Sequence, residues 1–306
     1  MPELPEVETI VRRLDEVLPG RSVGAASVPR ENVVRGPVAR FVEAVEGSTV
    51  ERVERRAKFI VIRLGGDRVW ITHLRMSGKY RFVPAAGDAE TEGRELGDGS
   101  ARVATGDASA ETALEPDPAE AKYVRAVFEL DDGARLLYVD PRTLGEMEVL
   151  DGAAWREKEA TLGPEPLAED FTAEVLLERL SATRREVKIA LLDQSVVAGL
   201  GNIYVCEALW RARVSPRRRG VNVGPTRAGR IHRAIVEVLS EAVGKQGTSL
   251  GATYLNWADD RGESGGFYAF LDVYGREGEP CRRCEAEIRR IVQAQRSTWY
   301  CPGCQR

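Results

Sequence analysis

The chain has 306 residues, of which 43% are hydrophobic and 30% charged, and its formal net charge is -4. This length is enough to bury a large core and predicts two or more domains. The sequence contains no apolar run long enough to span a bilayer and no signal peptide. These features argue against a membrane-spanning protein, and we expect a soluble protein of the cytoplasm.

The charge is unevenly distributed along the chain. Residues 84–121 carry ten Asp and Glu residues and two Arg, a local balance of -8. Residues 181–306 carry 20 Lys and Arg against 13 Asp and Glu, a balance of +7. The overall negative charge argues weakly against a nucleic-acid partner, whereas the basic C-terminal part has the sign expected of a phosphate-binding surface.

The first six residues bring together groups that can perform covalent chemistry. Proline at position 2 permits removal of Met1, which leaves Pro2 with a free secondary amine. An α-amine has a pKa of about 7.7–8, so a neutral fraction can attack a carbonyl-type carbon and form a Schiff base. Glu3 and Glu6 follow within one helical turn and can shuttle protons. The competing interpretation is that these residues only begin a helix, whose apolar stripe is Val7, Ile10, Val11, Leu14 and Leu18.

Residues 22–83 are predicted to form mainly strands, with a short helix over 39–47. We predict one long strand over residues 48–64, paired with residues 68–76 through a glycine turn. Lys58 lies at the end of the apolar face of that long strand. A lysine there either extends to water or points into a functional site. The sequence alone favours extension to water.

Residues 84–121 are rich in Ala, Gly, Glu, Asp and Thr and are predicted to form a disordered surface loop. Strands resume at residues 122–130 and 134–140, joined by Asp131-Asp132-Gly133 in a hairpin. A turn at residues 140–145 precedes a further short strand.

A proline-rich linker is predicted within residues 151–170, and helices dominate afterwards. Between two of these helices, Gly199 and Gly201 form a tight turn, and Asn202 is a good N-cap for the helix that follows. Free N–H groups at such a helix start are a natural phosphate site, although an ordinary helix hairpin would look the same. Cys206 is expected to lie in the core. Residues 246–273 are predicted to form a mobile loop that closes over a ligand.

The C-terminal tail contains two C-x-x-C pairs separated by sixteen residues: Cys281, Cys284, Cys301 and Cys304. In a cytosolic chain this pattern predicts one tetrahedral Zn²⁺ rather than disulfides. Four thiolates leave no open position for catalysis, so the metal is expected to hold a β-hairpin. Arg289, Arg290 and Arg296 would lie on or near this hairpin, either solvated or in contact with DNA phosphates.

Seven motifs along the chain together resemble the bacterial formamidopyrimidine-DNA glycosylase family. They are PELPEVET, RRAKF, THLRMSGKY, DPRTLG, LLDQSVVAGLGNIYVCEALW, VYGREGEPC and QRSTWYCPGCQ. The resemblance runs from end to end, excluding residues 84–121. It implies a bifunctional enzyme that excises 8-oxoguanine and formamidopyrimidines from duplex DNA through a Schiff base of the N-terminal proline, followed by β,δ-elimination.

The resemblance also implies an α+β fold and its domain organisation. A β-sandwich-like domain with the N-terminal helix would cover residues 1–150. After the linker, a helix–two-turn–helix domain with a lesion-capping loop would cover residues 171–265. A zinc hairpin would cover residues 266–306. We expect a monomer whose partner is double-stranded DNA containing oxidised bases.

The family resemblance assigns roles to individual residues. Pro2 would be the nucleophile and Glu3 the proton donor and acceptor, with Glu6 and Lys58 in the same catalytic site. The flipped base would leave a gap for Arg142, Met76 and Leu144 to fill. The phosphates flanking the lesion would contact Asn202 and Arg296, and Lys188 is a further expected DNA contact.

Two alternatives remain open from the sequence. The first is a relative of endonuclease VIII acting on oxidised pyrimidines, although its start typically reads PEGPE and this chain has Leu4 instead. The second is a catalytically silent zinc protein that only binds DNA, which would have no need of Pro2, Glu3 or Lys58. A departure from the family pattern is Leu144, because phenylalanine is common at that position.

Overall fold

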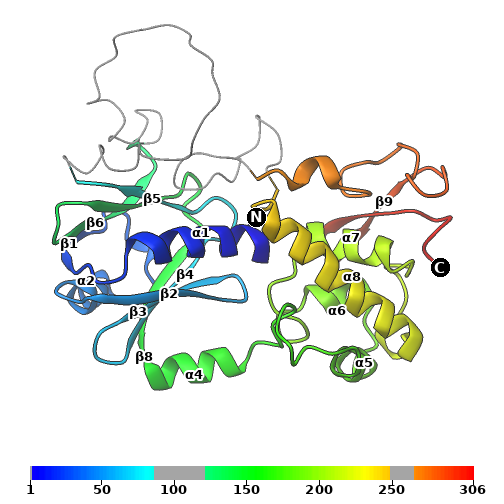
Figure 1. The fold of residues 1–306 in the computed structure, drawn as a ribbon, viewed down its shortest axis with the longest axis horizontal. Helices are drawn as coiled ribbons and strands as arrows, with labels where there is room; N and C mark the ends of the chain where they lie inside the picture. Colours follow the sequence, from blue (N-terminus) through cyan, green and yellow to red (C-terminus); the bar gives the residue numbers. More distant parts are fainter. Residues whose placement is uncertain (1, 86–120, 249–264) are drawn as a thin grey trace, which may run out of the picture.

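The structure, a computed structural model, describes residues 2–85, 121–248 and 265–306. Strands of the N-terminal part lie on one side of the molecule, and helices with the C-terminal hairpin lie on the other (Figure 1). The predicted acidic loop and the predicted ligand-covering loop fall largely on residues 86–120 and 249–264, outside the described residues. Within the described parts, no helix is both long and apolar enough to cross a membrane.

The N-terminal part is a sandwich of two four-stranded sheets whose neighbouring strands are all antiparallel. One sheet has the order β1-β6-β7-β5, with the bounds Val23–Ser27, Val124–Leu130, Arg135–Val139 and Lys79–Val83. The other has the order β2-β3-β4-β8, with the bounds Val50–Arg56, Phe59–Leu64, Arg68–His73 and Glu146–Asp151. Their inner faces meet where Trp70 packs on Phe128, with ring centroids 4.5 Å apart. The predicted β-sandwich is therefore confirmed.

The first helix, α1 (Leu4–Val17), packs against both halves of the molecule. Leu4 belongs to the core of the helical domain. The whole predicted stripe lies in the sandwich core: Val7, Ile10, Val11, Leu14 and Leu18. Burial of each such side chain contributes about 1.5–3 kcal/mol, so packing fixes where the helix start, with Pro2 and Glu3, must lie.

The prediction of one long strand over residues 48–64 is wrong. The segment is a hairpin in which β2 and β3 pair antiparallel, from Arg56↔Phe59 to Val50↔Leu64. The turn between them consists of Ala57 and Lys58, and Ala57 has a φ of 54°. No glycine marks this reversal, which is why the sequence pattern concealed it. Lys58 is consequently at a turn rather than on a strand face.

The helical part begins earlier than predicted, because residues 152–160 of the expected linker form α4 (Gly152–Ala160). Trp155 anchors this helix among Val61, Val69 and Ile71 of the second sheet. The remaining helices are α2 (Val38–Val45), α5 (Ala173–Ser181), α6 (Val187–Leu192), α7 (Asn202–Arg211) and α8 (Pro225–Gly244). Short 3-10 turns are η1 (Glu31–Val33), η3 (Gly220–Asn222) and η4 (Phe267–Phe270).

The predicted C-terminal hairpin is confirmed as β9 (Arg289–Gln293) paired antiparallel with β10 (Arg296–Tyr300). Its turn residues Ala294 and Gln295 have positive φ values of 45° and 61°. This is the left-handed backbone that two-residue hairpin loops of the primed type require. The hairpin packs on α7, so its strands are fixed relative to the helical domain.

Candidate active site and nucleic-acid interface

Glu3 lies at the boundary between the two halves and caps a helix of the other half. Its Oε1 accepts the N–H of Ile203 at 2.9 Å, and its Oε2 accepts the N–H of Tyr204 at 3.4 Å. These are free N–H groups of the first turn of α7, which also presents the positive end of the helix dipole. The carboxylate therefore occupies two of the N–H groups at the helix start that were predicted to bind a phosphate.

The glycine turn before α7 is shaped to admit this carboxylate. A Cβ at Gly201 would lie 2.2 Å from Cδ of Glu3, and one at Gly199 would lie 2.6 Å from Cδ1 of Leu4. Gly199 also has a φ of 80° and accepts the N–H of Leu4 at 3.1 Å. Gln194 Oε1 accepts the N–H of Gly199 at 2.9 Å. The turn therefore docks the start of the chain.

Asn202 was predicted as the N-cap of α7, and this is also incorrect. Gly201 is the N-cap residue and Asn202 is the first residue of the helix. The Asn202 side chain instead donates from Nδ2 to the carbonyl oxygen of Ser297 at 2.9 Å. It therefore ties the glycine turn to the C-terminal hairpin, directly beside Arg296.

Glu6 is buried and accepts hydrogen bonds from several directions. Its Oε1 accepts from Tyr204 Oη at 2.6 Å and from Thr248 N and Oγ1 at 2.8 and 3.1 Å. Its Oε2 accepts the N–H of Glu3 at 2.9 Å. A carboxylate with four donors is well satisfied in the interior, so Glu6 anchors Glu3 and the end of α8 to one another.

Lys58 is buried, with 5% of its surface exposed, so the reading that it extends to water is wrong. Burial lowers the pKa of its ammonium, and Arg296 lowers it further, whereas Glu3 and Glu6 raise it. Burial raises the pKa of the Glu3 carboxyl, while Lys58 opposes this rise. The two groups therefore lie within electrostatic reach of one another and of the Pro2 end of the chain. Such shifts are typical of proton-transfer sites.

Glu165 from the linker supports the turn that carries Lys58. It accepts the N–H of Ala57 at 2.5 Å, Nη1 of Arg55 at 2.6 Å and Nη1 of Arg56 at 2.9 Å. Arg56 also donates to the carbonyl oxygen of Gly163 at 2.8 Å. One carboxylate thus holds the left-handed Ala57 and both preceding arginines, and it joins the sandwich to the segment that leads into the helices.

The predicted gap-filling residues lie on two neighbouring loops. Met76 and Leu144 are 45% and 47% exposed, which is unusual for large apolar side chains. Arg142 lies beside Met76, with Nη1 3.5 Å from its sulfur. The buried Asp140 shapes this loop by accepting N–H groups of Arg142, Leu144 and Gly145, at 3.1, 2.9 and 2.8 Å.

Lys188 lies on α6 and is fully buried. Its ammonium makes no hydrogen bond to any described residue, and burial lowers its pKa. Arg296 and Glu3 also act on its pKa electrostatically, so Lys188 belongs to the same neighbourhood as the first residues of the chain. An unpaired buried ammonium is costly unless an anion approaches it.

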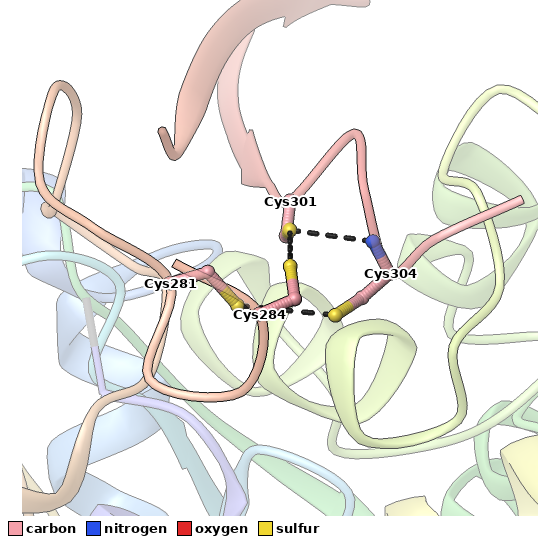
Figure 2. Close-up of side chains that lie close together, drawn as sticks. All are labelled: Cys281, Cys284, Cys301 and Cys304. Carbon is pink, nitrogen blue, oxygen red and sulfur yellow. Dashed lines mark hydrogen bonds between the residues drawn. The ribbon is translucent and has the colours of Figure 1, made fainter. Parts of the chain in front are cut away.

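The four tail cysteines converge, as Figure 2 shows. Their sulfur atoms all lie within 4.8 Å of one another, with Cys284 3.4 Å from Cys301 and Cys281 3.9 Å from Cys304. Tetrahedral zinc with Zn–S bonds of about 2.3 Å places its sulfurs about 3.8 Å apart. The donor set and its spacing therefore fit a four-thiolate zinc site. Cys206 is buried in the same small core as Cys281 and Cys301 but is not one of the converging cysteines, and burial raises its pKa to about 12, in agreement with its predicted place in the core.

Several residues that build the site were not recognised from the sequence. Glu165, Tyr204 and Thr248 act through contacts between segments far apart in the chain. Glu207 is another, because its buried carboxylate accepts the N–H groups of residues 272–274 and so ties α7 to the segment before the cysteines. The sequence signal that could have identified such a residue is an acidic side chain among apolar neighbours, as at Glu207 in α7.

Three family models match successive parts of the chain. The formamidopyrimidine-DNA glycosylase N-terminal domain matches residues 1–147, and the formamidopyrimidine-DNA glycosylase H2TH domain matches residues 162–253. The zinc finger found in FPG and IleRS matches residues 278–306.

Full-length relatives and a solved structure agree with these models. The formamidopyrimidine-DNA glycosylase of Ruegeria pomeroyi is 41% identical over 311 residues, covering 100% of both chains. That of Chloroflexus aurantiacus is 39% identical over 306 residues, covering 100% of this chain and 98% of the relative. The Lactococcus lactis Fpg in complex with DNA containing an abasic site is 31% identical, with a TM-score of 0.79 and 99% of each chain covered.

Proposed function

Because the chain belongs to the formamidopyrimidine-DNA glycosylase family, we propose that the amine of Pro2 is its nucleophile, acting beside Glu3 and Lys58. The protein is a DNA glycosylase for oxidised purines with an associated lyase activity towards abasic sites. The observation that carries the proposed residue roles is the buried position of Glu3 at the start of α7, with an electrostatically coupled Lys58.

The proposed reaction begins when the unprotonated Pro2 nitrogen attacks C1′ of the damaged nucleotide. The C1′–N bond to the base breaks, and the base leaves with the bonding electrons and takes up the proton that the Pro2 nitrogen loses on bonding C1′. Glu3 then protonates the sugar ring oxygen, which opens the ring and leaves an iminium between Pro2 and C1′. The raised pKa of Glu3 favours its protonated form before this step. As a carboxylate it then accepts a proton during elimination.

The proposed DNA contacts use the groups around this centre. Lys58, Asn202 and Arg296 would contact the phosphates flanking the lesion, and Lys188 would pair its ammonium with a neighbouring phosphate. On the other side of the flipped nucleotide, Met76, Arg142 and Leu144 would fill the gap. The exposure of Met76 and Leu144 supports this assignment, because both side chains are free to enter a duplex.

We further propose one structural Zn²⁺ held by the four tail cysteines, which supplies folding energy and no catalysis. The enzyme would act as a monomer in the bacterial cytosol. Its proposed domains are residues 1–150, 171–265 and 266–306, with 151–170 between the first two.

The proposal is tested by borohydride trapping, since borohydride reduces a Schiff base to a stable covalent adduct. One duplex carries 8-oxoguanine opposite cytosine and the other carries an oxidised pyrimidine. We expect the adduct mainly on the first duplex, with its loss in Pro2→Gly. An adduct mainly on the second would move the chain towards endonuclease VIII specificity. Tight binding without any adduct would support the silent DNA-binding alternative.

The lowered pKa of Lys58 predicts a pH effect on DNA affinity. A protonated Lys58 attracts a phosphate, so affinity is lost as pH rises through the pKa of Lys58, which lies below the ordinary 10.5. Glu3 opposes this lowering, so Glu3→Gln is expected to move the loss of affinity to a lower pH. The measurement is the Kd for an uncleavable abasic-analogue duplex between pH 6 and pH 10. A Lys58→Met control should lack this alkaline loss, and the same pH dependence in Lys58→Met would contradict the assignment.

Substitution of Glu165 is expected to have a large effect on the free energy of unfolding. Glu165→Ala removes the shared partner of Arg55 and Arg56 and of the Ala57 N–H. Breaking such a partly buried pair costs about 3–5 kcal/mol, which a urea-unfolding midpoint would report. The matched control is Glu159→Ala, whose carboxylate pairs with Arg56 alone and is more exposed, so we expect a loss of about 1 kcal/mol or less. Equal losses would refute the special role of Glu165.

A further inference from the structure

Residues 211–233 form the most basic segment outside the catalytic site. They contain eight arginines and no aspartate or glutamate. Like charges at this density repel one another, and this repulsion lowers the stability of the folded chain unless a bound anion neutralises it. The segment runs from the end of α7, through the loop before η3, into the first half of α8.

The arginines line two open hollows on the surface. The first, of about 340 Å³, is lined by Arg211, Ala212, Arg213, Arg230, Arg233, Ala234 and Glu237. The second, of about 420 Å³, is lined by Ser215, Arg217, Arg218, Arg219, Asn222, Gln305 and Arg306. Small-molecule pockets of this size are predominantly apolar. Hollows lined mainly by guanidinium groups are better suited to phosphates.

Most of these guanidinium groups have no counter-ion among the described residues. Arg211 pairs with Glu241 at 2.7 Å, but no other arginine of the segment forms an ion pair within the described chain. The Nε atoms of Arg218 and Arg227 are buried and donate no hydrogen bond to a described residue. Burial lowers the pKa of Arg218, and Arg227 and Arg230 lower it further. Arg230 of the first hollow therefore lies within electrostatic reach of Arg218 of the second.

The first of these hollows is far from the catalytic centre, whereas the second adjoins α6, where the N–H of Val187 donates to the carbonyl oxygen of Arg218 at 2.6 Å. The C-terminal end of α8 lies beside Glu6, through Thr248. At a rise of about 1.5 Å per residue, Arg230 and Arg227 lie about 20–25 Å along α8 from that end. In Figure 1, α8 runs from beside the N-terminus towards the far end of the helical part. A group at Pro2 and one at Arg227 are thus at opposite ends of this helix.

We propose that the arginines of residues 211–233 form a second DNA-binding surface, which holds the phosphates of a separate duplex segment while the proposed active site around Pro2, Glu3 and Lys58 (the cleft) holds the lesion. The surface carries several unpaired guanidinium groups on three chain segments, which matches the extended, evenly spaced charge of duplex DNA rather than a single small anion. Such a surface lets one molecule pass between DNA segments during its search. The proposal does not depend on which lesion the cleft prefers.

The test saturates the cleft with a short uncleavable abasic-analogue duplex and then adds a fluorescent duplex without a lesion. Fluorescence anisotropy should report binding of the second duplex to the loaded protein. The logarithm of this affinity should fall with the logarithm of salt concentration. In Arg217→Gln/Arg230→Gln the slope should decrease by about 2, since each lost phosphate contact removes about 1. Lesion binding in the cleft should be unchanged.

The matched control is Arg40→Gln/Arg156→Gln, which removes the same charge from two exposed arginines of α2 and α4 that have no described ion pair. It should leave binding of the second duplex as in the wild type. Failure of the loaded protein to bind a second duplex would overturn the proposal. An equal effect of the control would also overturn it by showing a response to net charge alone. Weaker lesion binding in Arg217→Gln/Arg230→Gln would place these arginines on the cleft duplex instead.

Discussion

Glu3→Gln is expected to slow single-turnover strand cleavage at 8-oxoguanine by about 10²–10⁴-fold, the range for loss of a general acid and base. Glutamine can still accept the N–H of Ile203, so the start of α7 remains capped. It cannot protonate the sugar ring oxygen or accept a proton afterwards. The measurement is the rate of strand cleavage at saturating enzyme, which removes product release from the observed rate.

The matched control for this effect is Glu16→Gln on the same helix. Glu16 is exposed and pairs with Arg13 at 2.7 Å, so its removal should cost less than about 1 kcal/mol of stability and leave strand cleavage unchanged. DNA affinity of Glu3→Gln near neutral pH should remain close to that of the wild type. A Glu3→Gln enzyme with the wild-type rate of strand cleavage would show that another group transfers the proton.

The elements of the fold followed from patterns that are local in sequence. The stripe of α1, the hairpin around Asp131-Asp132-Gly133 and the cysteine hairpin each combine a regular apolar period with a recognisable turn or ligand signal. The β2–β3 hairpin carried no such signal, because its turn is Ala57-Lys58. That turn is stabilised by Glu165, more than a hundred residues away. A contact of that kind cannot be read from local pattern.

In the site, the chemical groups could be predicted from the sequence, but their arrangement in space could not. Glu3 and Lys58 were recognisable as chemical groups, but their electrostatic coupling depends on the docking of α1 on the helical domain. The prediction for Asn202 failed for the same reason. Asparagine is a favoured N-cap residue, so the local sequence supported that prediction. Here Glu3, from the other half of the molecule, reaches the free N–H groups of α7, and Asn202 is released to contact the hairpin.

Cys301→Ala is expected to lose zinc and to unfold the C-terminal hairpin. Cys301 is fully buried and lies beside Cys284, so no neighbouring sulfur can replace it among the described residues. In small zinc modules the binding energy of the metal is folding energy. The hairpin also holds Arg296 and accepts the Asn202 hydrogen bond at Ser297. Unfolding of the hairpin would therefore remove the proposed phosphate contacts of Arg296 and Asn202. Both are hydrogen bonds to a charged group, so their loss predicts a fall in DNA affinity of about 10²-fold or more.

Zinc content by atomic absorption and the Kd for lesion duplex test this prediction together, and a strong chelator applied to the wild type should reproduce both losses. The matched control is Cys206→Ala, because Cys206 is buried in the same small core as Cys281 and Cys301 but is not among the converging cysteines. It should keep its zinc and its DNA affinity, with a packing cost of about 1 kcal/mol. A Cys301→Ala protein that binds lesion duplex normally would separate the hairpin from DNA binding. The phosphate contacts would then have to come from Lys58, Lys188 and Asn202, which all lie outside the zinc module.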